Sequence, residues 1–196
     1  MANKIKFGLK NVYYAVATIA ADGSATYDTP VAIPGAVSLS MEPQGENTPF
    51  YADNIVYWVG AANNGYEGDL EIARVPDSFK TDVLGYIASG NGLLVEDANA
   101  AAGHFALMFQ FEGDEKATRH VMYNCTATRA AAAGNTKGES IEPETESLTI
   151  TATSIYLAAL DTDIVKSETD ANTSTTVYDA WFDAVTVPTA PTAVTT

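Results

Sequence analysis

The side chains of this chain that titrate closest to neutral pH and are first candidates for acid–base or nucleophilic chemistry are two histidines and one cysteine. His120 and Cys125 lie five residues apart on one predicted strand, where side chains alternate between faces, so we expect them on opposite faces. His104 could approach Cys125 across a hairpin, although a histidine satisfied at the surface is the simpler interpretation. Two histidines cannot hold a metal unaided, and the sequence contains no CxxC, HExxH, Walker A or complete GxGxxG spacing. We therefore expect no catalytic residue, no cofactor, no metal site and no enzyme activity.

Charge is the next property that limits function. Ten Lys and Arg stand against 25 Asp and Glu, a net charge of −15, which argues against a protein that grips nucleic acid through its phosphates. The first 21 residues carry Lys4, Lys6 and Lys10 and no acid, whereas the chain from Glu139 onward carries ten acids and one base, Lys166. Two interpretations stay open. The charges form a solvated surface, or a basic N-terminal arm docks on an acidic region of a neighbouring subunit.

Length and composition indicate one domain. With 196 residues, 46% of them hydrophobic, the chain can bury one sizeable core and is short for two. We expect a single domain over residues 1–187 and a flexible tail, rich in Pro and Thr, over residues 188–196. One cysteine excludes an internal disulfide framework and is typical of a reducing compartment. The sequence shows no signal peptide and no 18-residue apolar span, so we expect folding in the cytoplasm and no membrane partner.

The elements that must position these side chains are mostly strands, because apolar residues alternate with polar ones along much of the chain. The alternation predicts strands with one dry face each near residues 37–41, 69–72, 105–111, 121–125 and 147–153. Hairpin turns are predicted at residues 21–24, where Asp-Gly supplies the positive φ of a tight turn, and at residues 112–116. In total we expect about eight to ten strands.

One segment has helical periodicity instead. Apolar residues recur at spacing four with one more alongside: Phe79, Val83, Ile87 and Leu84. They predict a short helix over about residues 77–88, capped by Asp77 or Ser78 and ended by Gly90. Residues 161–176 are polar and irregular, and the segment that follows predicts a last strand. The expected fold class is mainly β, a β-sandwich with one short flanking α-helix.

A long loop is expected over residues 42–66, between two predicted strands. At about 25 residues it exceeds the usual length of a loop in a compact domain unless the loop is functional or disordered. Its aromatic side chains are typical of contact surfaces. We expect the loop to contact another subunit and to be mobile in the free monomer. The candidate contact residues are Glu46, Phe50, Tyr51, Asp53, Tyr57, Trp58 and Tyr66.

Five segments in fixed order carry a resemblance to a known family. They are PGAVSLSMEPQGENTPFYADN, NNGYEGDLEIARVPDSFKTDVLG, HFALMFQF, RHVMYNCTATR and ESLTITAT. With them the chain resembles the major tail protein, or tail tube protein, family of long-tailed, non-contractile phages of Gram-positive bacteria. The similarity extends from about Phe7 to Ala184. Its specificity lies in the number and order of the segments, because none is a catalytic signature.

The resemblance implies a β-sandwich with one flanking helix that forms a six-fold ring. Rings would stack into a virion tail tube through which double-stranded DNA passes without specific binding. The implied partners are other copies of the chain, the tape measure protein inside the tube, and the tail terminator and tail tip proteins. The protein would be made in the cytoplasm of the bacterial host. The long loop would then join successive rings.

If DNA passes through the tube, the inner wall should be acidic, because neutralised phosphates would hold the DNA. The first candidates for this wall are Asp69 and Glu71, which lie opposite the apolar face of their strand. Glu142, Glu144 and Glu146 are the next candidates, since strand periodicity puts them on one face. For these three glutamates, protection of a sheet edge from unwanted pairing and a contact between rings also stay open. For all five acids, solubility of the outer surface is a further alternative.

Two other classes of function remain to be distinguished. One is a different virion component, a decoration or adhesion β-sandwich that binds a host or capsid surface. The other is an enzyme with a site that the sequence does not reveal. Self-stacking into hollow tubes or rings would favour the tail tube over the first, and a deep polar pocket would favour the second.

Overall fold

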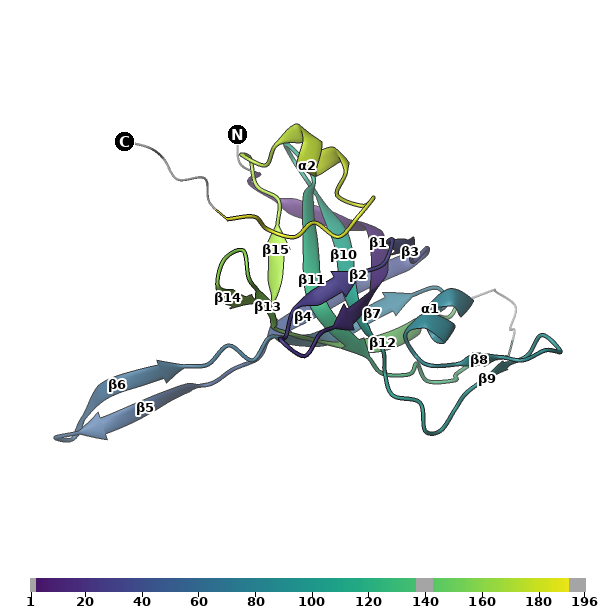
Figure 1. The fold of residues 1–196 in the computed structure, drawn as a ribbon, viewed down its shortest axis with the longest axis horizontal. Coiled ribbons are helices and arrows are strands. Elements are labelled where there is room, and N and C mark those ends of the chain that lie inside the picture. Colours follow the sequence, from purple (N-terminus) through teal and green to yellow (C-terminus); the bar gives the residue numbers. More distant parts are fainter. Residues whose placement is uncertain (1–2, 137–142, 191–196) are drawn as a thin grey trace.

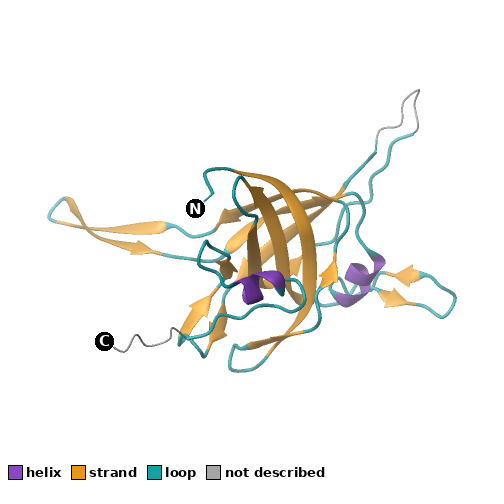
Figure 2. Ribbon diagram, turned by 90° about the horizontal axis from the view of Figure 1, so that it is seen from above, coloured by secondary structure: helices purple, strands orange, loops and turns teal. Residues whose placement is uncertain are grey.

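Antiparallel strands dominate the computed structural model, which describes residues 3–136 and 143–190. The main sheet has the strand order β2-β1-β10-β11-β12-β7-β4, with β3 also paired to β1 and β15 also paired to β11. Its strands are β1 (Lys6–Ile19), β2 (Ala25–Tyr27), β3 (Val31–Ala32), β4 (Ala36–Pro43), β7 (Tyr66–Ile72), β10 (His104–Gly113), β11 (Thr118–Ala127), β12 (Glu146–Thr153) and β15 (Lys166–Glu168). The sheet curves strongly, so that its two halves face each other (Figure 2). The predicted mainly β, sandwich-like fold is confirmed.

Short hairpins and helices surround the main sheet (Figure 1). The hairpins are β5 (Asn47–Ala52) with β6 (Ile55–Ala61), β8 (Ile87–Ala88) with β9 (Leu94–Val95), and β13 (Ile155–Leu157) with β14 (Thr162–Ile164). The helices are α1 (Asp77–Asp82) and α2 (Thr175–Asp179). No helix in the described part of the chain is long and apolar enough to cross a membrane.

The main core lies between the two halves of the curved sheet. Alternate residues of β7 and β12 point into it, including Leu70 and Ile150, which are fully buried. At one end α1 closes the core with Phe79, whose ring meets the rings of Tyr14 and Phe105 edge to face. The predicted period-two alternation of these strands is confirmed, and so are the two predicted hairpin turns.

Strand β10 is buried on both faces, which differs from the predicted single dry face. Ala106 and Met108 point away from the main core and are fully buried in a second cluster. Trp181, 3% exposed, packs on this cluster from the segment after α2. The hydroxyl of Tyr123 donates a hydrogen bond of 2.9 Å to the carbonyl of Thr186 and so ties this C-terminal segment to the sheet. The predicted last strand after residue 176 is therefore wrong, because the segment forms α2 and then packs over the second cluster.

A β-bulge in β11 changes which side chains share a face. Phe105 pairs with Cys125 but Leu107 pairs with Met122, so β11 has one residue more than β10 over this stretch. The extra residue puts Cys125 in the main core, whereas Tyr123 points into the second cluster. At the same bulge β11 exchanges its partner β15 for β12. The prediction that Cys125 and His120 lie on opposite faces fails here, because strict alternation does not hold across a bulge.

Helix α1 is shorter than the predicted helix over residues 77–88. It follows Pro76 without a side-chain cap and ends at Asp82, with Val83 as the C-cap residue. Gly85, at φ +72°, then turns the chain, and a Cβ there would lie 2.6 Å from that of Ala100. The chain beyond is extended, so Ile87 belongs to β8 and is 54% exposed. Residues 161–176, predicted to be irregular, contain β14, β15 and the start of α2.

Residues 42–66 do not form the loop without structure that the sequence predicts. Strand β4 continues to Pro43, β7 begins at Tyr66, and β5 and β6 between them form a projecting hairpin (Figure 1). We name residues 45–64 the arm. Two backbone hydrogen bonds of 2.8 Å close its base: the N–H of Gln44 donates to the carbonyl of Gly65, and the N–H of Asn64 donates to the carbonyl of Gln44.

We expect Phe79→Ala to lower the free energy of unfolding by about 3–5 kcal/mol, because the removed ring leaves a cavity where α1 covers the core. Urea denaturation monitored by circular dichroism would measure this. The control is Ile87→Ala, which the predicted helix would bury but the structure exposes, and its effect should stay within about 0.5 kcal/mol. Equal losses for the two variants would contradict the described end of α1.

Candidate interaction surfaces

The arm presents a continuous set of exposed apolar side chains. Its two strands contact each other, and both ribbon views show the hairpin extending away from the sandwich (Figures 1 and 2). The exposed large residues are Phe50, Tyr51, Ile55, Val56, Tyr57, Trp58 and Val59. Exposed apolar clusters of this kind mark interaction sites in soluble proteins. The arm is therefore the first candidate for a contact with a partner.

Backbone chemistry explains why the arm is a hairpin. Asp53 and Asn54 have φ values of 51° and 63°, as the central residues of a two-residue type I′ turn require. Asn and Asp tolerate these angles better than other residues with side chains, so the Asp-Asn pair was a signal that the sequence analysis missed. Phe50 pairs with Trp58 and Tyr51 with Val56, which leaves Tyr57 as the extra residue of a bulge.

The candidate contact residues do not all lie on the arm. Glu46 and Asp53 are exposed there, together with the aromatic candidates Phe50, Tyr51, Tyr57 and Trp58. Tyr66 is separate, because it is the first residue of β7, is half-buried, and packs against the main core. The ammonium group of Lys166 lies 4.9 Å from the centre of its ring.

Strands β4, β7 and β12 present a second candidate surface on their outer side. Register pairs Asp69 with Ser40 and Thr149, and Glu71 with Ser38 and Ser147. Residues directly opposite in antiparallel strands share a face. We name this surface the acidic sheet face; it consists of Ser38, Ser40, Glu42, Glu67, Asp69, Glu71, Ser147, Thr149 and Thr151. Acids and hydroxyls occupy it, without a basic residue among these positions.

Hydroxyl groups fix the carboxylates of this face. Thr149 donates a hydrogen bond of 2.7 Å to Asp69. Glu71 accepts bonds of 2.6 Å from the hydroxyl of Thr145 and 2.9 Å from that of Ser38. These two bonds, that from Thr145 first, hold the pKa of Glu71 below its ordinary value. The face therefore stays negatively charged at neutral pH.

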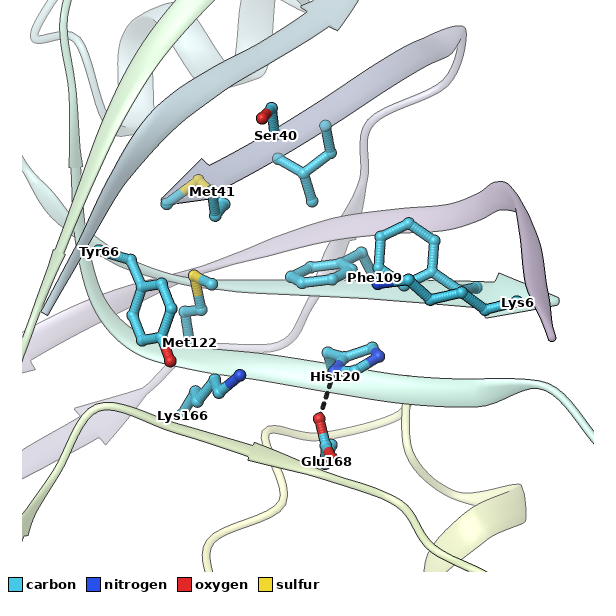
Figure 3. Close-up of a pocket in the computed structure, with 11 residues that line it drawn as sticks. Lys6, Ser40, Met41, Tyr66, Phe109, His120, Met122, Lys166 and Glu168 are labelled. Carbon is cyan, nitrogen blue, oxygen red and sulfur yellow. Dashed lines mark ion pairs between the residues drawn. The ribbon is translucent and has the colours of Figure 1, made fainter. Parts of the chain in front are cut away.

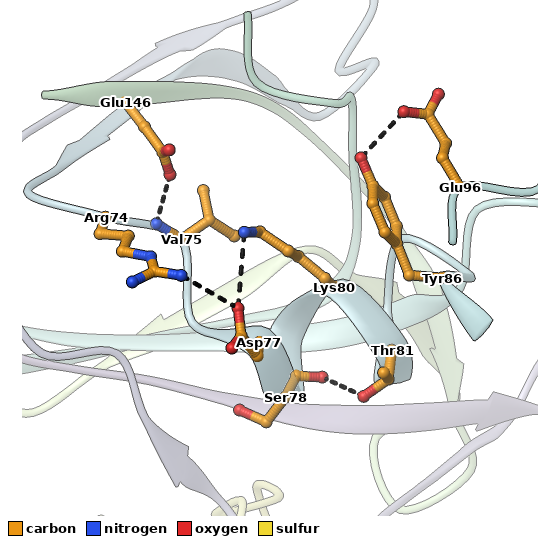
Figure 4. A network of polar contacts seen from close by, with 9 residues as sticks. All are labelled: Arg74, Val75, Asp77, Ser78, Lys80, Thr81, Tyr86, Glu96 and Glu146. Atoms are coloured by element: carbon orange, nitrogen blue, oxygen red, sulfur yellow. Dashed lines mark hydrogen bonds and ion pairs between the residues drawn. The ribbon is translucent and has the colours of Figure 1, made fainter. Parts of the chain in front are cut away.

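Of the three glutamates predicted to follow one another on a strand, Glu144 and Glu146 have separate environments. The carboxylate of Glu146 is half-buried and accepts a bond of 2.5 Å from the backbone N–H of Val75 beside α1 (Figure 4). Since Glu146 pairs with the buried Ile72, it does not lie on the acidic sheet face. Glu144 accepts a bond of 2.6 Å from the backbone N–H of Asn135. Glu142 lies outside the described residues.

The basic residues near the N-terminus do not form a separate arm from Lys6 onward, which corrects that expectation. Lys6 and Lys10 belong to β1, and Lys10 pairs with Glu112 of the same chain at 2.5 Å. The backbone N–H of Lys4 donates a bond of 2.8 Å to Asp114. Strand pairing with β10 therefore positions this segment, and the exposed ion pair adds little to stability.

A pocket of about 340 Å³ opens between β4, β11 and β15 (Figure 3). The His120 ring stacks on the Phe109 ring at 5.0 Å between centres, and its Nδ1 lies 3.2 Å from a carboxylate oxygen of Glu168. Burial lowers the pKa of His120, against the opposing effect of Glu168, so the ring is neutral at neutral pH. The sequence analysis missed this pocket because β15 was not predicted.

The thiol of Cys125 has no nucleophilic character in this structure. Its side chain is fully buried, and burial raises its pKa to about 12, so the thiol stays protonated. His104 does not activate it; the Nδ1 of His104 lies 2.7 Å from the side-chain oxygen of Asn124. Among the described residues, His, Cys, Asp and Glu form no group of three or more that could hold a metal ion.

A curved β-sandwich with a projecting apolar arm and an acidic sheet face defines a structural subunit that works through its surfaces. Comparison with known families agrees with this class. The model of the family described as phage tail tube protein matches residues 2–190, and the chain belongs to this family. The search among curated proteins gave no match.

Family membership confirms the resemblance drawn from the sequence. The chain is a structural component of a phage tail, and the family implies that copies of it assemble into a tube in the virion. The Gram-positive host stays a prediction.

We expect Thr145→Val to raise the pKa of Glu71 toward its ordinary value, because the variant removes the hydrogen bond that lowers it most. A carboxyl whose pKa is depressed on folding contributes stability above the unfolded pKa and loses it as pH falls through the folded pKa. The variant should therefore have a lower free energy of unfolding at neutral pH. That free energy should also fall less steeply as the pH is lowered. Carbon-detected NMR titration would measure the pKa.

The control for this experiment is Thr149→Val, whose hydroxyl bonds Asp69 instead. It should leave the pKa of Glu71 unchanged. An unchanged pKa in the Thr145→Val protein would refute the assigned hydrogen bond.

Proposed function

We propose that the protein forms hexameric rings that stack into the tail tube and that the tube conducts double-stranded DNA during ejection. The observation that carries this proposal is the arm, a hairpin with exposed apolar side chains that projects from a sandwich with its own core. Exposure of these side chains to water is unfavourable, and burial against another copy removes that cost. Family membership supplies the context of a tail tube.

The arm joins successive rings in this proposal. Its apolar surface differs from the acidic sheet face, so the two surfaces suit different partners. A contact between unlike surfaces on identical subunits is heterologous and generates a ring or an open filament. Stacked rings need such a contact along the tube axis, and a projecting hairpin provides the reach.

The acidic sheet face lines the lumen in this proposal. Glu42 and Glu67 are direct cross-strand partners, an arrangement of like charges that disfavours the folded monomer. A wall of carboxylates and hydroxyls neutralises no phosphate, so it releases no counterions and does not hold DNA. Asp69 and Glu71 lie at the centre of this face. The tape measure protein would occupy the same lumen before DNA enters.

The remaining partners follow from the geometry of a finite stack. One end exposes unpaired arms and the other exposes the surfaces that would receive them. Two proteins of different shape must therefore close the two ends, which fits a tail terminator and a tail tip protein. Assembly would take place in the host cytoplasm, where the chain is made.

Replacing residues 45–64 by Asn-Gly should give a folded monomer that does not form tubes. Gln44 and Gly65 are already hydrogen-bonded neighbours, so a two-residue turn can join β4 to β7 without changing their register. Thermal unfolding and negative-stain microscopy of concentrated protein would measure the two properties. Tubes formed by this variant would refute the role of the arm.

Hydrogen exchange separates assembly from folding in the unmodified protein. Amides of the arm should exchange fast in the monomer, since few buried contacts protect them, and slowly in assembled tubes. The amides of β10 and β11 serve as the internal control and should be protected in both states. Equal exchange of the arm in both states would contradict a contact between rings.

Replacing Asp69 and Glu71 together by Lys should leave tubes intact but slow DNA ejection, because the new cations would bind phosphates. Added salt should relieve the delay. The control replaces Glu115 and Asp179 by Lys, the same change of charge at two exposed positions away from the acidic sheet face. Normal ejection of the Asp69 and Glu71 variant at low salt would refute the lumen assignment.

A further inference from the structure

The pocket beside β4 lies at the base of the arm. Met41 near the end of β4 and Tyr66 at the start of β7 both line it (Figure 3). The arm lies between these two residues in the chain. Strand β4 is the last strand of the main sheet, so nothing in the strand order covers its far edge. The pocket lies between this edge and β15.

Apolar rings and thioethers form the inside of the pocket. Phe109 and Met122 are almost fully buried there, and Met41 and Phe111 are half-buried. Methionine side chains adapt to an inserted ring and make favourable sulfur–aromatic contacts. The volume of about 340 Å³ lies at the lower end of the range for ligand pockets, which suits one inserted side chain with its backbone.

Cations stand at the mouth of the pocket. Lys6 and Lys166 are exposed and line it from β1 and β15. The acid at the mouth, Glu168, lies beside the nitrogen of His120. An occupant with an aromatic side chain and a nearby carboxylate would therefore match both the inside and the mouth.

The arm has this chemistry. Tyr57 is the most exposed large hydrophobic residue among those described, at 71%, and the bulge at its position directs it out of the regular strand pattern. Asp53 lies at the tip, Glu46 lies near the base, and residues 45–64 contain no Lys or Arg. The arm is thus apolar and acidic, and the pocket combines apolar rings and thioethers with polar side chains, two of them lysines at its mouth.

We propose that the pocket receives Tyr57 from the arm of a second copy of the chain, with Asp53 facing Lys6 and Lys166. The inference rests on the proposed role of the arm and names the surface that accepts it. An arm cannot fill its own pocket, because its extended strands carry the tip up to about 30 Å from the base at roughly 3.3 Å per residue. Each copy therefore inserts its Tyr57 into the pocket of one neighbour and receives the Tyr57 of another.

The hairpin β8–β9 is the competing acceptor. Its exposed Leu93 and Leu94 are apolar, but the hairpin is a convex projection that cannot enclose a ring (Figure 2). Glu96, which is paired with Arg129, follows it directly, and Asp97 comes next with a negative charge that would repel the acidic arm. Both shape and charge favour the pocket.

Disulfide trapping tests the contact. The double variant Met41→Cys with Tyr57→Cys is assembled, oxidised mildly and separated on a denaturing gel. A head-to-tail contact should give a ladder of covalent oligomers, since every chain carries both partners. The buried Cys125 does not take part, and each single variant serves as a control. The comparison variant Leu94→Cys with Tyr57→Cys should give no ladder; a ladder there and none from the first pair would overturn the proposal.

Charge reversal tests the same contact without new cysteines. Lys166→Glu should raise the protein concentration needed for assembly by at least roughly tenfold, because it faces Asp53 with a like charge. Adding Asp53→Lys to that variant should restore assembly. Lack of rescue would overturn the proposed pairing.

The two proposals fail in different ways. If the unmodified protein forms no tubes under any condition, the proposed function fails. If it forms tubes, but the pair at 41 and 57 gives no ladder and charge reversal shows no rescue, only the docking of the arm in the pocket fails.

Discussion

The burial of β10 and β11 on both faces is the constraint on which the rest of the structure depends. Most central residues of β10 are apolar whatever face they point to, so the strand needs a layer on each side. The opposite half of the curved sheet and α1 supply one layer, and the segment that carries Trp181 supplies the other. Both ends of the chain, through β1 and the C-terminal segment, are therefore used to enclose these two strands. The candidate surfaces left for partners are the hairpins, the outer side of β4, β7 and β12, and the pocket between β4, β11 and β15.

This separation of the core from the exposed surfaces explains how one domain can be stable and still present an apolar contact surface. The arm contributes little to the core, so its sequence is free to carry exposed aromatic residues. The net charge of −15 opposes association of identical chains, and salt screens that repulsion. Apolar contacts must exceed the repulsion before a tube forms. Acids concentrated on one sheet face, turned toward a lumen, would lie apart from the contacts that join subunits.

The sequence predicts the strands of this fold wherever strict alternation holds, as in β7 and β12. The prediction of which side chains share a face fails where an extra residue interrupts the alternation, as the bulge beside Tyr123 does in β11. The sequence does not reveal this bulge, because no residue type marks a bulge uniquely. Ile87 continued a helical pattern that Gly85 interrupts, and tertiary packing decided which signal prevailed. Of the candidate surfaces, the arm residues and Asp69 with Glu71 could be found from composition and alternation. The pocket could not, since residues from six strands far apart in the chain meet there.

A two-stranded ribbon has two open edges, and an exposed apolar ribbon could add further strands without limit and grow into fibrils. Pro49 in the middle of β5 opposes this, because a ladder accommodates proline only where its nitrogen faces away from the paired strand. One open edge thus lacks a donor that an added strand would need. Pro43 occupies a similar place at the end of β4, the last strand of the main sheet. In the proposed assembly, the exposed apolar hairpin is thus directed toward side-chain docking on one partner instead of open-ended β-sheet growth.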